Sequence, residues 1–443
     1  MVFSSIGFIF IFFPLFLFSY YKVPETYRNI VLFVGSLVFY LFGSYGHPEY
    51  IGLFVASIVL NYFFGLLLRI KKHTWVAVLG VGMNVLCLVL CKFVLHILPI
   101  GISFYTFQAI SYLCDIRAGK CKAERSFLSF AVYLSMFPQL IAGPIVQYPS
   151  ICEQIQKREY HFPGFVAGLQ IFIIGLGSKV LLANSMGRLW KQLSAIGYES
   201  ISTPLAWMGT IGYSFQIYFD FLGYSLMAIG LGRMLGFRLP KNFDSPYLST
   251  SMTEFWRCWH MTLGKWFREY VYIPLGGNRK GTFLTYRNLL IVWMLTGMWH
   301  GSSLNFCLWG LLLFCLIAIE KAGLKRILDR FRLLGHLYMC LVIPLSWMVF
   351  AHTDIAQMKL LFTRLFGIEN PAGVIFQGDY LKYGREYGIY LLLCALFVTR
   401  IPQYIWEKLR TTYIGQILLT GIFVASVYFL YQGLDNPFLY YQF

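Results

Sequence analysis

Long runs without a single Asp, Glu, Lys or Arg are the feature that most constrains this chain. Runs of 18 or more such residues include 29–48, 50–68, 74–91, 126–152, 288–319, 333–353 and 411–434. A helix needs about 20 apolar residues to cross a bilayer, so each run is long enough to span a membrane. Only 12% of the residues are charged, about half of the roughly 25% that is typical of soluble domains. The sequence therefore predicts an all-α polytopic membrane protein.

Shorter or interrupted apolar segments add to the predicted number of helices. Residues 1–21 have no basic residue ahead of their apolar stretch and no pattern of small residues for cleavage, so we expect a retained helix rather than a signal peptide. Segments broken by Pro, Gly or a lone charge include 98–114 and 200–232. The total predicted is about 11 to 13 transmembrane or re-entrant helices. Without a repeat of fixed period or a long linker, residues 1–443 are expected to form one membrane-embedded domain.

The net charge of +17 fits membrane topology better than nucleic-acid binding. The basic residues lie in short loops between apolar runs, at 69–73, 117–125 and 321–332, whereas the connections at 43–48 and 96–100 have almost none. Because basic loops stay in the cytoplasm, this asymmetry predicts an N-terminus on the outer side. We expect the lipid bilayer, and no nucleic acid, as a partner. The ten cysteines are mostly scattered singly, which indicates neither a disulfide framework nor a metal site.

Residues 233–287 are too polar to cross a membrane and too aromatic for a solvated loop. Within them, Ser251 and Glu254 have the spacing of a capping box, which predicts the start of a helix. Helical periodicity then places five apolar residues on one face: Phe255, Trp259, Leu263, Trp266 and Tyr270. A second face carries Arg257, His260, Gly264, Lys265 and Arg268. Two interpretations stay open, an amphipathic helix at the membrane interface and a basic face that receives an anionic substrate.

His300 lies near the middle of the longest uncharged run. Ionisable residues inside a membrane usually face the bundle interior or a cavity, and they are functional candidates for that reason. The alternative is a neutral histidine that is hydrogen-bonded in the core. Neutral imidazole takes a proton from a hydroxyl at neutral pH, so His300 is a candidate general base. Gly301 would allow a close approach of substrate or backbone, and Trp299 and Asn305 are candidates for binding or orienting the substrate.

Asp220 is the other charge inside a predicted span, and it is a second candidate for contact with the substrate or its donor. Three interpretations are open for this carboxylate: it orients a histidine, it pairs with an arginine such as Arg233, or it ties helices together.

Several segments, in chain order, resemble the membrane-bound O-acyltransferase family and in particular its alginate O-acetylation branch. They are MVFSS at 1–5, LPIGISFYTF at 98–107, FPQLIAGP at 137–144, YFD at 218–220, FWRCWH at 255–260, YIPLGGNR at 272–279, LTGMWHG at 295–301 and NPF at 436–438. The resemblance implies helices that form a ring around a central funnel. It also implies that His300 is the active-site histidine deep in the membrane and that His260 is the second characteristic histidine.

The chain departs from this branch at three positions. Leu222 and Leu226 stand where relatives usually carry a serine and an acid, and Cys258 stands where an arginine is common. We therefore expect less polar support near Asp220 and one positive charge fewer on the side that faces the donor.

The resemblance also implies a reaction, which is acetyl transfer from a cytoplasmic thioester, acetyl-coenzyme A, to an exported or cell-surface polysaccharide. An extracytoplasmic acetyltransferase of the SGNH or GDSL type would be the partner, no cofactor would be bound, and the site would be the cytoplasmic membrane of a bacterium. A basic face with Arg257, Lys265 and Arg268 suits the phosphates of coenzyme A. Two alternatives remain: D-alanyl transfer to teichoic acid from a carrier-protein thioester, and a transporter or lipid scramblase.

Overall fold

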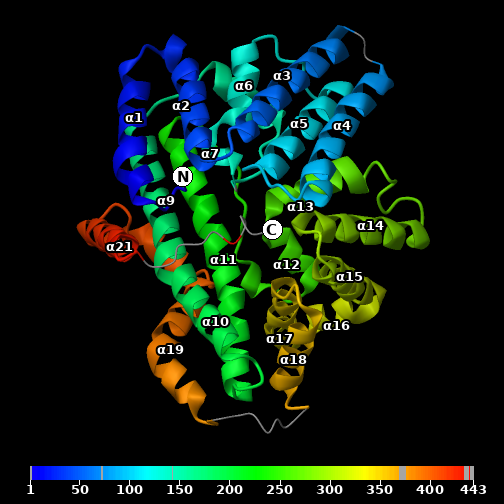
Figure 1. Cartoon of the computed structure of the whole chain (residues 1–443), viewed down its shortest axis with the longest axis vertical. Coiled ribbons are helices and arrows are strands. Elements are labelled where there is room, and N and C mark those ends of the chain that lie inside the picture. Colours follow the sequence, from blue (N-terminus) through cyan, green and yellow to red (C-terminus); the bar gives the residue numbers. More distant parts are fainter. Residues whose placement is uncertain (1, 71–72, 142, 369–375, 434–438, 440–443) are drawn as a thin grey trace. The chain divides into compact units, whose positions relative to one another are not determined.

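The computed structural model describes residues 2–70, 73–141, 143–368, 376–433 and 439, and within these ranges it is helical without any strand (Figure 1). The predicted all-α class is confirmed. Helices are the expected outcome because a bilayer offers no water to backbone groups, so each N–H and C=O must find its partner within its own segment.

The chain forms two compact units, and each takes residues from two stretches of the sequence. The first comprises Met1–Leu176 and Tyr224–Lys241, and the second comprises Gly177–Gly223 and Asn242–Phe443. The long helix α11 (Thr203–Met234) runs from the second unit into the first. The single domain expected for residues 1–443 stays a prediction.

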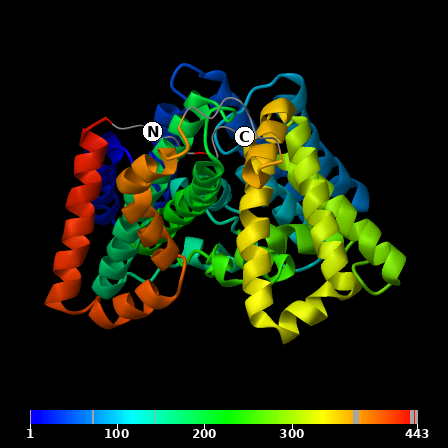
Figure 2. The ribbon, with the colours of Figure 1, turned by 90° about the horizontal axis from the view of Figure 1, so that it is seen from below.

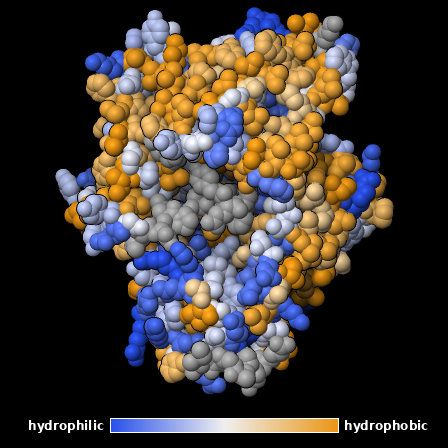
Figure 3. Space-filling view, viewed as in Figure 1, coloured by the Kyte–Doolittle hydropathy of each residue, from blue (hydrophilic) through white to orange (hydrophobic). Residues whose placement is uncertain are grey.

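The first unit contains helices α1 to α9, of which α2, α3, α4, α5 and α6 pack on one another. Their bounds are α1 Phe13–Lys22, α2 Arg28–Gly43, α3 Glu49–Ile70, α4 Thr74–Val89, α5 Ile102–Arg117, α6 Phe127–Ser135, α7 Phe137–Leu140, α8 Cys152–Gln156 and α9 Phe162–Gly177. Apolar residues cover most of the visible face of α1 to α5 (Figure 3). Exposed side chains on α1 and α3 include Leu15, Phe18 and Phe63, as expected for helices that face lipid.

The second unit contains the remaining helices and carries every residue of the predicted site. Their bounds are α10 Asn184–Ile196, α12 Met252–Cys258, α13 Met261–Phe267, α14 Thr282–His300, α15 Leu304–Ile319, α16 Lys325–Arg330, α17 Arg332–Ala351, α18 Ile355–Phe366, α19 Asp379–Phe397, α20 Ile401–Leu409 and α21 Tyr413–Tyr431.

Seven helical segments among the described residues are long and apolar enough to cross a membrane: Glu25–Gly43, Glu49–Ile70, Thr74–Val94, Phe162–Ile196, Leu304–Arg330, Arg332–Ala351 and Tyr413–Tyr431. The pair α19 and α20, bent by 77°, is an eighth if it forms one span. The expected 11 to 13 also counted broken and re-entrant segments. The helices α11 and α14 are long enough but are not among the seven, because their polar and small residues lower the mean hydropathy.

Two of these uncharged runs are long enough to span a membrane but are not single helices. The described part of residues 126–152 contains the short helices α6 and α7 and a 3₁₀ turn at Tyr148–Ser150, and α8 begins at its last residue. Pro138 and Pro144 lie in this run, and proline removes a backbone donor and ends helices. The run 288–319 is split by an irregular turn at 301–303 into α14 and α15.

The helices α14 and α15 form a tightly packed antiparallel pair, visible in yellow-green beside α17 in Figures 1 and 2. Two glycines allow this approach. A Cβ added to Gly310 would lie 2.5 Å from the Trp293 carbonyl oxygen, and one added to Gly297 would collide with the Phe306 carbonyl oxygen. Glycines let helix backbones approach closely in membranes. This pairing fixes the end of α14, where His300 lies.

Candidate active site

The segment 251–270, which carries the predicted aromatic and basic faces, folds into two short helices, α12 and α13. The prediction of one continuous amphipathic helix is therefore wrong. His260, between α12 and α13, has φ 43° and ψ 52°, a conformation that costs a non-glycine residue about 1–3 kcal/mol. Backbone hydrogen bonds offset this cost. The Asp244 N–H donates to the Cys258 carbonyl, and the Met261 N–H donates to the Asn242 carbonyl. Residues 242–244 thus hold the break in place.

His260 is buried, with 2% of its surface exposed. Its Nδ1 lies 3.1 Å from Asn242 Oδ1, which also accepts the Thr262 hydroxyl at 2.9 Å. Because an amide oxygen only accepts hydrogen bonds, Nδ1 carries the ring proton and Nε2 has the lone pair. Burial lowers the pKa of His260 to about 3, since desolvation disfavours the charged form. The ring is therefore neutral at physiological pH.

His300 ends α14 and is also buried, with 6% of its surface exposed. Aromatic rings surround it: the centroid of its imidazole lies 5.2 Å from that of Trp309 and 5.1 Å from that of Phe350, with interplanar angles of 90° and 82°. The space beside Gly301, where we expected a substrate or backbone to approach, is occupied by the Phe306 ring.

Trp299 contacts both histidines. Its ring centroid lies 4.6 Å from that of His300 and 6.3 Å from that of His260. The structure therefore brings the two histidines, which are forty residues apart in sequence, against a single indole ring within the second unit.

A cluster of tryptophans from α12, α14, α15 and α17 joins the elements that carry these histidines. The Trp256 ring of α12 lies 5.0 Å from Trp293 of α14 and 5.5 Å from Trp309 of α15, between centroids. Trp309 also stacks with Trp347 of α17 at 5.8 Å. Aromatic pairs of this kind contribute about 0.5–1.5 kcal/mol each beyond their buried area. The tryptophan cluster thus fixes α12 against the helix that ends at His300.

Asn305 has a partner within the fold. It is fully buried, and its Nδ2 donates to the carbonyls of Phe350 at 2.9 Å and Val349 at 3.4 Å. These carbonyls belong to the last turn of α17, where no backbone donor follows in the helix. The Asn305 side chain therefore ties the start of α15 to the end of α17, close to His300.

Asp220 pairs with Lys179, a residue that the sequence analysis did not single out. The Lys179 Nζ lies 2.7 Å from Asp220 Oδ1, and both side chains are 2% exposed. Asp220 Oδ2 also accepts the Leu439 N–H at 2.9 Å. The sequence did contain a signal for this pair, because Lys179 is a lone charge within an apolar stretch and such a charge requires a partner.

Of the segments that carried the resemblance, Met1, Ala142 and residues 436–438 lie outside the described residues.

The basic residues expected on one face lie on separate elements because the helix breaks at His260. Arg257 is on α12, whereas Lys265 is on α13 and Arg268 begins the π-helical segment Arg268–Tyr272. Lys265 is 59% exposed and lies 4.0 Å from Glu269.

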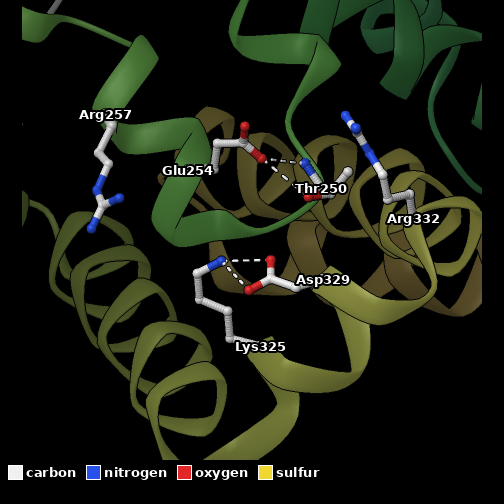
Figure 4. A pocket seen from close by; sticks show the side chains of 6 residues that line it. All are labelled: Thr250, Glu254, Arg257, Lys325, Asp329 and Arg332. Atoms are coloured by element: carbon white, nitrogen blue, oxygen red, sulfur yellow. Dashed lines mark hydrogen bonds and ion pairs between the residues drawn. The ribbon is translucent and has the colours of Figure 1, made fainter.

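Arg257 lines a pocket of about 320 Å³ with five residues that are all polar or charged: Thr250, Glu254, Lys325, Asp329 and Arg332 (Figure 4). Both carboxylates in the pocket have partners within the fold. Glu254 accepts hydrogen bonds from Thr250, and Asp329 accepts one from Lys325 at 2.6 Å. Arg257 and Arg332 stand on opposite sides of these pairs in Figure 4. Sequence analysis predicted Arg257 as a donor-binding residue and placed Lys325 and Arg332 only in a basic loop.

Among the described residues, no group of three or more His, Cys, Asp or Glu side chains is arranged to hold a metal ion.

Known proteins resemble this chain over most of its length. The model of the membrane-bound O-acyltransferase family matches residues 117–350, which include both buried histidines. The probable alginate O-acetylase of Pseudomonas putida is 34% identical and is matched over 100% of both chains. That of Pseudomonas fluorescens is 40% identical over 83% of this chain and 76% of its own. The peptidoglycan O-acetyltransferase of Helicobacter pylori is 35% identical over 73% of this chain and 71% of its own. The chain belongs to the membrane-bound O-acyltransferase family and is a multi-pass membrane acyltransferase.

Proposed function

We propose that this protein passes an acetyl group from cytoplasmic acetyl-coenzyme A across the cytoplasmic membrane of a bacterium for O-acetylation of an exported or cell-surface polysaccharide. The acceptor class is supported by the relatives, which are named for alginate and peptidoglycan O-acetylation. The observation that carries the catalytic part is the contact of buried His260 and His300 with the same Trp299 ring.

His300 acts as the general base in this proposal. Its imidazole removes the proton of the acceptor hydroxyl, whose oxygen attacks the thioester carbonyl carbon. The tetrahedral intermediate then collapses, the carbon–sulfur bond breaks, and the imidazolium returns the proton to the leaving thiolate. The products are an acetyl ester and coenzyme A with a free thiol. The aromatic surroundings of His300 exclude water, which would otherwise hydrolyse the thioester.

His260 has a supporting role in the same proposal. Its Nδ1–H is directed to Asn242, which leaves Nε2 to accept a hydrogen bond. A neutral ring with this tautomer stabilises an oxyanion poorly, because that task requires a donor. We therefore assign His260 to positioning the donor or the acceptor by accepting its hydrogen bond.

The pocket around Arg257 is proposed to hold the phosphates of the donor. Its guanidinium groups, Arg257 and Arg332, suit phosphate oxygens in charge and geometry. Arg332 ends the basic segment 321–332, which the charge asymmetry assigns to the cytoplasm. Lys265 and Arg268 are assigned to the same donor-facing side. The acceptor then approaches from the outer side, where a separate SGNH or GDSL-type acetyltransferase completes the modification.

Transfer of radiolabelled acetyl from acetyl-coenzyme A tests this function in inverted membrane vesicles, which expose the cytoplasmic face. The variants are wild type, His300→Gln and the control His161→Gln, whose histidine is 69% exposed. The extracytoplasmic partner is present in one series and absent in the other. Loss of a general base lowers the rate by about 10²–10⁴-fold, so His300→Gln is expected to lose labelling while His161→Gln keeps it.

Equal labelling by His300→Gln and wild type would contradict His300 as the base. Labelling only from a carrier-protein thioester would replace acetyl-coenzyme A as the donor and favour the D-alanyl alternative. Movement of intact substrate without thioester cleavage would favour transport over acyl transfer.

A further inference from the structure

Glu320 is a buried carboxylate at the end of α15. It begins the π-helical segment Glu320–Leu324, and 1% of its surface is exposed. It also lies within the candidate span Leu304–Arg330. Removing a carboxylate from water costs several kcal/mol unless strong hydrogen bonds compensate its charge. The compensation in this protein comes from a segment near residue 250.

Three donors at the start of α12 bind the Glu320 carboxylate. Oε1 accepts the Met252 N–H at 2.6 Å, and Oε2 accepts the Thr253 N–H at 2.8 Å and the Thr253 hydroxyl at 2.5 Å. Hydrogen bonds to an ionised acceptor are about twice as strong as neutral ones, and negative charge is favoured at a helix N-terminus. One carboxylate thus joins the start of α12 to the end of α15.

The next N–H of α12 also has a side-chain acceptor. Ser251 Oγ accepts the Glu254 N–H at 3.2 Å, which confirms the predicted cap. The Glu254 carboxylate accepts the Thr250 N–H at 2.8 Å. A helix of seven residues is too short to be stable alone, so these side chains and the tryptophan cluster determine where α12 lies.

The position of α12 in turn determines the placement of two proposed site residues. Arg257 lies in its last turn and lines the pocket. His260 follows at the left-handed break, against Phe221 at 4.6 Å and Trp299 at 6.3 Å between ring centroids. A shift at the start of α12 is therefore expected to move both residues relative to His300 at the end of α14.

We propose that Glu320 is a positioning residue for acyl transfer: its carboxylate holds the start of α12 and thereby sets His260 and Arg257 relative to His300. The inference rests on the proposed function for the roles of these three residues. Glu320 acts through α12 and does not contact the substrate.

Cys258 provides a native reporter of this arrangement, because it is a half-buried cysteine in the last turn of α12 and is not part of a disulfide. The first experiment compares the rate at which N-ethylmaleimide modifies Cys258, followed by mass spectrometry of its peptide, in wild type and Glu320→Gln. The amide keeps the shape but loses the charge. We expect a rise of about tenfold, which is the effect of losing charge-assisted hydrogen bonds. Glu407→Gln on α20 is the control, because Glu407 is exposed.

The second experiment measures acetyl transfer by the full-length protein in the same membranes. Glu320→Gln is expected to raise the KM for acetyl-coenzyme A more than it lowers kcat. In the double variant with Arg257→Gln, the rise in KM should be smaller than the product of the two single effects, because residues in one network couple. Glu320→Asp, which keeps the charge, should recover most of the wild-type KM and keeps the test valid if the glutamine variant does not fold.

An unchanged rate of Cys258 modification in Glu320→Gln would overturn the inference. It would also be overturned if Glu320→Gln had a lower thermal stability but the same kinetic constants as Glu407→Gln. Failure of the proposed function has a different signature. In that case wild type transfers no acetyl from acetyl-coenzyme A, yet the thiol measurement still reports whether Glu320 holds α12.

Discussion

Removing one partner of the Lys179–Asp220 ion pair is expected to destabilise the second unit severely. The two charged atoms are 2.7 Å apart, and both side chains are 2% exposed. At an effective dielectric constant of about 20, their attraction is about 6 kcal/mol, which offsets a desolvation cost of several kcal/mol for each ion. Asp220→Asn leaves Lys179 as a buried charge without its counter-ion, and the expected loss of stability is about 3–5 kcal/mol.

The matched variant is the double substitution Lys179→Met with Asp220→Leu, which removes both charges and keeps similar volume. Replacing a buried pair by apolar residues is often neutral or stabilising, so the double variant should be more stable than either single variant. The measurement is the thermal midpoint of the purified protein in detergent, monitored by the loss of the monodisperse peak in size-exclusion chromatography. A coupling energy follows from a cycle of wild type, Lys179→Met, Asp220→Leu and the double variant.

A different order of thermal stabilities among these variants would refute this reasoning. If Asp220→Asn is as stable as wild type, the carboxylate does not compensate Lys179. If the double variant is the least stable of the four, the pair contributes by its shape and by the Leu439 hydrogen bond to Asp220, and not by its charge.

Three further predictions concern the site. Gly297→Ala should lower the thermal midpoint and reduce acyl transfer, because the new methyl group meets the Phe306 carbonyl and forces α14 from α15 at a cost of about 1–3 kcal/mol. Arg257→Gln should raise the KM for acetyl-coenzyme A about tenfold with little change in kcat, as the loss of one charge-assisted hydrogen bond predicts. The folded-state pKa of His260, about 3, is below its ordinary value of 6.5, so the unfolded chain binds the proton first as pH falls. Between pH 7 and pH 5, wild type should lose about 2 kcal/mol of stability that His260→Gln keeps, measured by thermal unfolding.

Continuous apolar runs predicted the long spans well, because a bilayer permits few alternatives for such sequences. Residues 50–68, for example, became the helix Glu49–Ile70. The errors lie where chain breaks depend on tertiary contacts. Nothing in the periodicity of residues 251–270 reveals that residues 242–244 pair with the backbone around His260. Pro138 and the turn at 301–303 were visible in the sequence, but hydropathy alone does not separate one long helix from two short ones.

For the site, sequence reasoning identified residues whose chemistry is costly in a membrane, and it did not identify their partners. His300 and Asp220 were found because an ionisable group in an apolar run needs an explanation. The partner of Asp220 is Lys179, forty-one residues earlier in the chain, and neither a histidine nor Arg233 was needed. Pairing over such distances depends on how helices pack, which one sequence does not specify. The contact of Trp299 with both histidines also depends on helix packing, so the sequence did not reveal it.

The polar residues that sequence analysis missed have a common physical purpose. Between helices in a membrane, lipid tails are as apolar as leucine, so hydrophobic burial does little to fix irregular backbone, and hydrogen bonds and close packing must do so. The second unit has irregular backbone at two critical places, the break at His260 and the turn after His300. At the break, Asn242 accepts a hydrogen bond from His260. After the turn, Asn305 at the start of α15 donates a hydrogen bond to the end of α17. Glu320 fixes the start of the short helix that leads to His260. Substitution of any of these polar residues should therefore change the relative placement of the two histidines before it unfolds the long apolar helices, and activity should be lost at temperatures where the protein is still folded.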